Sequence, residues 1–198
     1  MSKNWTLVLV VAFALGFATK LYFDGQQEIT HQQAQQGSAM VVGNDGVMNL
    51  FDPQDSRIRI LYFGFTRCPD VCPTSLAMLS GAYNQLDDET LNQYYPVFVT
   101  LDPERDKGED AHKYSQYFHP RFSGVAGTTE VTEELAKRYG VIYQKTEMED
   151  SALEYSIDHN SYFYFVDKEG KLISKVPHTL SPDPIKATML QLTQDAKE

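Results

Sequence analysis

The strongest constraint on the fold is the run Arg57–Phe65, which is rich in isoleucine and aromatic residues and has little polar alternation. Such a run is typical of a central strand that is covered on both faces. Further strands are predicted at Tyr95–Leu101 and Ser161–Val166. Leu172–Val176 is predicted to pair antiparallel with the last of these, across a turn at residues 168–171. The strands together predict one buried sheet.

Helical patterns alternate with these strands. Apolar residues recur at helical spacing after Pro73, which suits the first turn of a helix. Further helices are predicted over Glu109–Phe118, Glu130–Tyr139 and Asp183–Gln194, and Gly140 is the expected C-cap of the helix before it. Elements in this order predict an α/β domain of thioredoxin-like fold, with a central mixed sheet flanked by helices.

The N-terminus is a different kind of segment. Trp5–Phe23 contains 19 residues and a single charge, Lys20, and as a helix it would span roughly 28 Å, close to the thickness of a bilayer core. We therefore predict that residues 1–23 form an N-terminal transmembrane helix that anchors the chain. A cleaved signal peptide is the alternative, because Ala12–Ala14 and Gly16–Ala18 both have the small-x-small pattern of a cleavage site.

The rest of the chain divides into a tether and a folded body. Residues 24–40 are rich in glutamine and have no apolar face, so they are predicted to be a tether in which His31 is solvated. Residues 41–198 form the predicted domain, which opens with a tight-turn signal at Asn44–Gly46. Both interpretations of the N-terminus place this domain outside the cytoplasm. We predict a single-pass protein of the inner membrane with its C-terminal domain in the periplasm or an equivalent space.

The charge of the chain excludes one class of partner. The formal net charge is −10, and from residue 21 onwards there are 15 basic and 27 acidic residues, so the exposed part carries −12. Nucleic-acid binding requires a basic footprint, so we expect no nucleic-acid partner.

Cys68 and Cys72 lie in one segment, C-P-D-V-C, directly after the central strand and at the start of a helix. The positive end of a helix stabilises a thiolate and lowers its pKa. If the segment begins to turn helically, the spacing places both residues on one face, roughly 5–6 Å apart. That separation permits either a disulfide or two ligands to one metal ion. A purely structural disulfide is the weaker alternative, because so short a loop contributes little and a domain of this size needs no staple.

His159 is the predicted third ligand. It directly precedes the strand Ser161–Val166, and in a thioredoxin-like fold the loop entering that strand packs against the cysteine loop. Asp158 or Asn160 could orient the imidazole from behind. The remaining histidines of the body are expected to be solvated or to cap turns: His112, His119 and His178.

Four segments in the same order resemble the signature of the Sco/SenC family. They are Phe63–Pro73, Leu101–Asp106, Phe122–Thr128 and the pair Asp158-His159 before a strand and hairpin, and the resemblance runs from about Gly43 to Leu192. The family implies a thioredoxin-like copper-binding protein that assists assembly of the dinuclear copper A centre of cytochrome c oxidase. It implies that Cys68, Cys72 and His159 bind the copper. It also implies the copper-site subunit of the oxidase as a partner and is compatible with a second one, another copper chaperone. The predicted N-terminal anchor adds the membrane.

Two thiolates and an imidazole suit Cu(I), and sulfur donors also tolerate Cu(II), whereas zinc would usually seek a fourth ligand. The competing function is a thiol–disulfide oxidoreductase that reduces the cysteines of the oxidase copper site through the redox-active pair Cys68 and Cys72. Whether the chain is an enzyme therefore stays open. A peroxidase is the weakest hypothesis, because only Arg67 beside Cys68 suggests it.

Three other positions lie in or near the motifs. Asp70 is either a turn residue or a group that tunes the charge of the site. Arg105 is expected to hold the loop Asp102–Asp106 through ion pairs. Met148, in the acidic stretch Glu147–Asp150, is a lesser candidate for a transient copper contact.

Overall fold

The computed structural model describes residues 13, 15–17, 19–20, 39–148 and 151–196. The chain divides into two units, residues 1–37 and 38–198, and the fold below is that of the second. Within the described ranges no helix combines the length and the apolar character needed to cross a bilayer. Most of the predicted anchor and nearly all of the predicted tether lie outside these ranges, so both stay predictions.

The domain is built on a five-stranded sheet with the order β5-β4-β3-β8-β9. The central strand β3 (Ile58–Gly64) runs parallel to β4 (Tyr94–Thr100), which in turn is parallel to β5 (Ser123–Val125). On its other side β3 is antiparallel to β8 (Tyr162–Val166), and β8 is antiparallel to β9 (Leu172–Pro177). All of β3 after its first residue is buried. The predicted central strand and the mixed sheet are thus confirmed.

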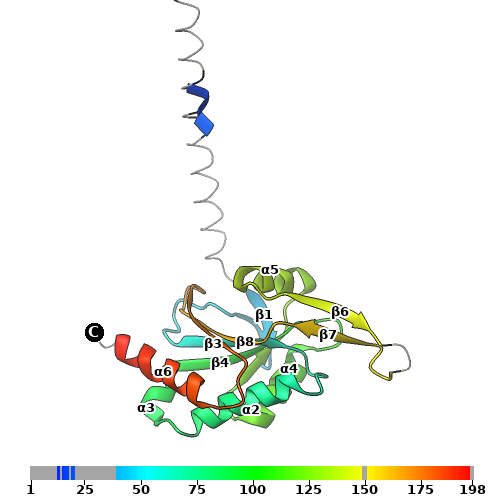
Figure 1. Cartoon of the computed structure of the whole chain (residues 1–198), viewed down its shortest axis with the longest axis vertical. Helices are drawn as coiled ribbons and strands as arrows, with labels where there is room; N and C mark the ends of the chain where they lie inside the picture. The colour runs from blue at the N-terminus through cyan, green and yellow to red at the C-terminus, as the bar shows by residue number, and fades with distance from the viewer. Residues whose placement is uncertain (1–12, 14, 18, 21–38, 149–150, 197–198) are drawn as a thin grey trace, which may run out of the picture. The chain divides into compact units, whose positions relative to one another are not determined.

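Helices cover both faces of this sheet (Figure 1). On one face lie α2 (Val71–Tyr83), the short α3 (Asp88–Leu91), α4 (Gly108–Phe118) and α6 (Asp183–Asp195). On the other lies α5 (Thr129–Tyr139), which ends as predicted at Gly140, whose φ of 66° is left-handed. Successive strand residues face opposite sides, so each face of the sheet packs against its own helices.

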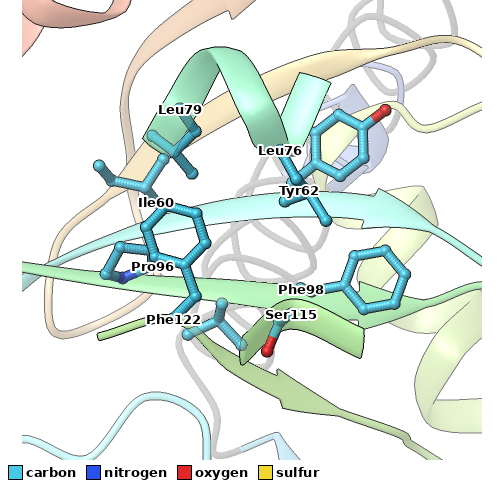
Figure 2. A pocket seen from close by; sticks show the side chains of 9 residues that line it. Ile60, Tyr62, Leu76, Leu79, Pro96, Phe98, Ser115 and Phe122 are labelled. Atoms are coloured by element: carbon cyan, nitrogen blue, oxygen red, sulfur yellow. The ribbon is translucent and has the colours of Figure 1, made fainter. Parts of the chain in front are cut away.

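The packing under α2 positions the cysteine segment. Figure 2 shows Leu76 and Leu79 of α2 above Ile60 and Tyr62 of β3, with Phe98 of β4 beside them. The gap enclosed by these side chains and their neighbours leaves no room for a water molecule. Dense packing of this kind makes the position of a helix costly to change. The first turn of α2 is therefore held firmly over the end of β3.

Two hairpins lie outside the main sheet. The first, β1 (Met40–Gly43) with β2 (Gly46–Asn49), turns where predicted, at Gly46 with φ 98°. It begins inside the segment assigned to the tether, and Ala39 before it is already buried. The second pairs β6 (Tyr143–Glu147) antiparallel with β7 (Tyr155–His159) in a separate two-stranded sheet.

Several boundaries differ from the sequence-based expectation. The helix expected from Pro73 begins two residues earlier, at Val71, and ends at Tyr83, so Leu86 lies beyond it. The short elements α3 and β5 and the hairpin of β6 and β7 were not predicted. α3 and β5 are very short and β6 is largely polar and exposed, so their apolar periodicity is weak, and β7 has only one buried residue, Ile157.

Candidate metal site

Cys72 lies in the first turn of α2 and is fully buried. Its sulfur fills space that Gly64, the last residue of β3, leaves open: a Cβ added at Gly64 would lie 2.7 Å from Cys72 Sγ and 3.0 Å from Phe98 Cε2. Carbon and sulfur atoms cannot approach so closely without displacement. Gly64 is therefore part of the site. Gly64 was not predicted as a site residue, although a glycine at the end of a buried strand often marks a close approach.

Cys68 lies before the helix and is half-buried. Its sulfur accepts a hydrogen bond from the backbone N–H of Cys72 at 3.4 Å. Asp70, at the N-cap position, makes no side-chain cap bond, so the sulfur of Cys68 serves the free end of the helix instead. The two cysteines do not share one helical face, because α2 begins only at Val71. Both are free thiols in this structure.

The two thiols have opposite acidities. A side-chain hydrogen bond from Cys72, together with backbone N–H groups of Asp70 and Cys72, lowers the pKa of Cys68 to about 5, against the opposing effect of its partial burial. The same bond to Cys68, and burial, raise the pKa of Cys72 above its ordinary range. The pair therefore holds one proton at neutral pH, on Cys72, and Cys68 is the thiolate.

His159, the last residue of β7, reaches the cysteines from the second hairpin. Its Nε2 lies 3.6 Å from Cys72 Sγ, and its Nδ1 lies 3.1 Å from the backbone carbonyl of Asn160. A carbonyl can only accept, so we assign the proton to Nδ1, which leaves the Nε2 lone pair facing the sulfur. Edge-on ring contacts of His159 with Tyr62 and Phe65 complete its surroundings.

The predicted orienting side chains have other partners. Asp158 accepts a hydrogen bond from the hydroxyl of Thr146 at 2.5 Å. The side-chain oxygen of Asn160 accepts from the backbone N–H of Ile142, and its amide nitrogen donates to the carbonyl of Gly140. Of the two residues expected to orient the imidazole, Asp158 bonds Thr146 instead, whereas Asn160 contacts His159 through its backbone carbonyl. The backbone carbonyl of Asn160 has that role, and the side chain of Asn160 fixes that backbone.

The three predicted ligands lie near one another but are not arranged around a common metal position. Cys72 contacts both Cys68 and His159. In the part of the chain that the structure describes, however, no three His, Cys, Asp or Glu side chains already stand as a metal-ligating cluster. A metal ion would have to draw the sulfur of Cys68 and the imidazole of His159 toward a common point. The donor types suit a soft ion, because two sulfurs and one imidazole nitrogen are available.

A buried carboxylate fixes the start of the cysteine loop. Asp106 accepts hydrogen bonds from the backbone N–H of Thr66 at 2.8 Å and from the hydroxyls of Thr66 and Thr100 at 2.5 and 2.7 Å. Its side chain is buried, so these charge-assisted bonds are strong. The loop from Thr66 to Asp70 is thus tied to the end of β4.

Arg105 ties the second hairpin to the same end of the sheet. Its guanidinium pairs with buried Asp102 at 2.5 Å, as the sequence analysis predicted, and also donates to the carbonyls of Leu153 and Tyr155 at 2.7 and 3.1 Å. The guanidinium carbon lies 3.4 Å from the centre of the Tyr155 ring. The hydroxyl of Tyr155 donates to Asp102 in turn. Arg105 therefore helps to place β7, and with it His159.

The other candidates have partners of their own or face solvent. His112 lies 3.5 Å from the hydroxyl of Ser123, and His178 lies 2.7 Å from the hydroxyl of Ser75. Burial lowers the pKa of His119, which caps a turn by accepting from the backbone N–H of Arg121, so its predicted capping role is confirmed. Asp70 interacts with Cys68 only through its backbone N–H. Among the described residues, Arg67 and Met148 make no hydrogen bond to either thiol.

The fold and the site define a class: thioredoxin-like α/β domains in which a C-x-x-x-C segment at a helix start faces a histidine. A family model described as SCO1/SenC matches residues 29–194. The chain belongs to the SCO1/SenC family.

Curated relatives are similar over part of their length. Protein SCO1 homolog 1, mitochondrial, of Arabidopsis thaliana is 42% identical over 114 residues, which are 58% of this chain and 34% of that protein. An SCO2-like protein of Rickettsia conorii is 31% identical over 137 residues, 69% of this chain and 66% of that one. This chain thus spans between about a third and two thirds of the length of these two relatives.

Solved structures share the fold. A crystal structure of Arabidopsis thaliana ScoI with copper bound is 32% identical, covers 80% of this chain and 98% of its own, and superposes with a TM-score of 0.71. Apo Sco1 of Thermus thermophilus, solved in solution, is 36% identical over 77% of this chain and 88% of its own, with a TM-score of 0.68. Yeast Sco1 with copper bound is 26% identical over 82% and 88%, with a TM-score of 0.67.

Proposed function

We propose that this chain is a copper metallochaperone that binds copper through Cys68, Cys72 and His159 and delivers it for assembly of cytochrome c oxidase. The dinuclear copper A centre of the oxidase is the proposed destination. Membership of the SCO1/SenC family supports this proposal, and so do the solved relatives that contain copper. Copper is the cargo of such a protein, so the site must both take it up and release it.

The observation that carries the proposal is the contact of buried Cys72 with both other donors. Its sulfur lies 3.6 Å from His159 Nε2, and its backbone N–H bonds the sulfur of Cys68. Cys68 is already a thiolate at neutral pH and is half-exposed, so it offers the first sulfur to an incoming ion. Cys72 then gives up the proton that the pair holds. Copper binding needs both thiols reduced, so it competes with disulfide formation.

The test is a titration of the reduced full chain with Cu(I) in competition with a chelator. His159→Ala should weaken binding, because one of three donors is lost. His112→Ala is the matched control, since His112 lies on α4 and bonds Ser123 instead. If His159→Ala and His112→Ala bind copper equally well, His159 is not a ligand. If the wild type binds no tighter than a simple monothiol, the copper site itself is wrong.

A second function, thiol–disulfide oxidoreductase, is favoured by one observation. A half-exposed thiolate beside a buried protonated thiol is the arrangement of an attacking and a resolving cysteine. Metal-free reduced protein should then reduce a disulfide-bonded substrate, and Cys68→Ser should abolish the reaction. If the wild type shows no turnover of the disulfide but binds Cu(I) tightly, only the metallochaperone function remains.

We also propose that residues 1–23 anchor the chain in the inner membrane, with the folded domain in the periplasm and the copper-site subunit of the oxidase as its partner. The support is the single charge among the 19 residues Trp5–Phe23. A membrane-impermeant maleimide should label Cys68 in intact spheroplasts that express the full chain. Labelling that appears only after lysis would place the domain on the other side.

A further inference from the structure

An open groove lies beside the cysteine loop. It has a volume of about 480 Å³, and its lining includes Thr66 and Arg67 from the loop and Lys113 and Tyr117 from α4. Arg67 is the residue directly before Cys68. The groove therefore begins where the proposed copper site ends, yet none of the three proposed ligands lines it.

The exposed part of the groove carries unpaired positive charge. Arg67 and Lys113 are both exposed, and neither has an ion-pair partner among the residues that the structure describes. Tyr117 follows Lys113 by one helical turn and is 87% exposed, the largest exposed fraction among the described large apolar side chains. Two free cations and an exposed aromatic ring on one groove are unexpected in a chain of net charge −10.

The inner wall of the groove carries two donors without acceptors. The hydroxyl of Tyr114 and Nη2 of Arg105 are both buried, and neither has a hydrogen-bond partner within the described part of the chain. The side chain of Arg105 is only 10% exposed. Buried donors without partners are rare in native proteins. Both atoms are closed off from solvent, so an acceptor in the groove would reach them only if the wall between them opened.

The carboxylates that line the groove are already engaged. Asp106 accepts from Thr66 and Thr100, and Asp110 accepts the backbone N–H of Lys107 at the start of α4. Each keeps its negative charge, so the lining carries three cations, Arg67, Arg105 and Lys113, against these two anions, and a net positive charge remains. The groove thus offers donors and positive charge, and what would complement it is an anionic acceptor.

We propose that this groove, the Arg67–Lys113 groove, binds an acidic segment of the protein with which the chain exchanges copper. The inference rests on the proposed function and names the surface that such a partner would use. A carboxylate on the segment would pair with Arg67 and Lys113, and an apolar part of it would cover Tyr117. Bound there, the partner lies next to Cys68, the donor that solvent reaches.

A peptide segment fits the groove better than a small free anion. The volume is in the range of pockets that hold ligands of many atoms, whereas a single carboxylate or phosphate fills only a small part of it. The two free cations come from separate elements, so one small anion would leave much of the groove empty. An exposed tyrosine is also typical of surfaces that bind proteins.

The experiment measures binding of a short fluorescent peptide of alternating Glu and Ala to the full chain in detergent, by fluorescence anisotropy. We expect Lys113→Glu to weaken binding by about tenfold at low salt, and Tyr117→Ala to weaken it as well. Lys137→Glu is the matched control, because Lys137 is an exposed helical lysine on α5, which lies on the other face of the sheet. Raising the salt from about 0.05 M to about 0.5 M should weaken binding to the wild type.

Each other outcome counts against the proposal. Equal binding of the peptide to the wild type and to Lys113→Glu would overturn the proposal. So would equally tight binding of a control peptide in which every Glu is replaced by Lys. If free glutarate displaces the peptide at concentrations near the dissociation constant of the peptide, the groove is a small-anion site instead. Cu(I) affinity is measured for every variant without peptide. If Cu(I) binds normally but the peptide does not bind as expected, this inference alone is refuted. If the wild type does not bind Cu(I), the proposed function is refuted.

Discussion

Replacing Gly64 by alanine should disturb the site more than its single methyl group suggests. The new Cβ would lie 2.7 Å from Cys72 Sγ and 3.0 Å from Phe98 Cε2, both deep in the core. Ordinary contacts between such atoms are about 3.5–4.0 Å. Either the sulfur or the end of β3 must therefore move by roughly 1 Å.

The expected cost follows from this overlap. Overpacking a filled core costs about 1–3 kcal/mol, and alanine recovers only about 0.5–1 kcal/mol of backbone entropy relative to glycine. We expect a net loss of about 1–2 kcal/mol in the free energy of unfolding. The change displaces a proposed ligand from behind, and alterations beside metal ligands typically cost about 10–100-fold in affinity, so Cu(I) affinity should fall by at least about tenfold.

The assay combines urea unfolding with Cu(I) titration of the full chain. The control is Gly81→Ala on α2, where the new Cβ would meet Pro182 at an ordinary 3.4 Å and where alanine favours the helix. That variant should keep both its stability and its copper affinity. The decisive comparison is Gly64→Ala in a Cys72→Ala background, where removal of the sulfur should relieve most of the cost. An unchanged cost there would refute the argument that Gly64 makes room for Cys72.

Three other changes test the surroundings of the thiols. Asp106→Ala leaves the backbone N–H of Thr66 without an acceptor and should cost about 2–3 kcal/mol in urea unfolding, with weaker Cu(I) binding as the loop loosens. Iodoacetamide should alkylate Cys68 in the metal-free protein at a rate that rises up to about pH 6 and then levels. The reason is that the Cys68 pKa of about 5 depletes the thiolate only in acid. An ordinary thiol reacts slowly until about pH 8.5. Arg105→Met leaves buried Asp102 unpaired and should cost about 3 kcal/mol in thermal or urea unfolding.

These predictions have controls of their own. Asp45→Ala in the exposed turn between β1 and β2 should leave stability nearly unchanged, so an equal loss there would contradict the role given to Asp106. Cys68→Ser should abolish the alkylation that occurs near pH 6. If that alkylation persists in the variant, the reactive thiol is Cys72. Lys145→Met removes an exposed ion pair with Glu104 and should cost less than about 1 kcal/mol. A cost as large as that of Arg105→Met would speak against the buried pair.

The strongly apolar parts of the fold could be predicted from the sequence. β3 and β8 are nearly continuous apolar runs, and the caps of α5 are encoded by Thr128 and Gly140. The hairpin of β6 and β7 could not be predicted, because four of the five residues of β6 are exposed and polar. Its position depends on tertiary contacts made by Arg105, which leave no local pattern.

The candidate site was predictable in composition but not in detail. The proximity of His159 to the cysteines followed from the order of the elements. Asn160 was one of the two predicted orienting residues, but nothing in the sequence indicates that its backbone carbonyl makes the contact. Asp158 is excluded by strand geometry, since neighbouring residues of β7 point to opposite sides. The role of Gly64 needs three-dimensional distances, because only those show what its missing side chain would meet.

The hairpin that carries His159 has a consequence for release of a bound ion. Cys68 and Cys72 belong to a loop and helix packed on the five-stranded sheet, whereas His159 belongs to a separate two-stranded sheet. Proteins open locally in units of unequal stability, and a lone hairpin is among the least stable of such units. The hairpin can therefore detach at a smaller free-energy cost than unfolding of the core. Its detachment would reduce a three-donor site to a two-thiolate site while the rest of the domain stays folded.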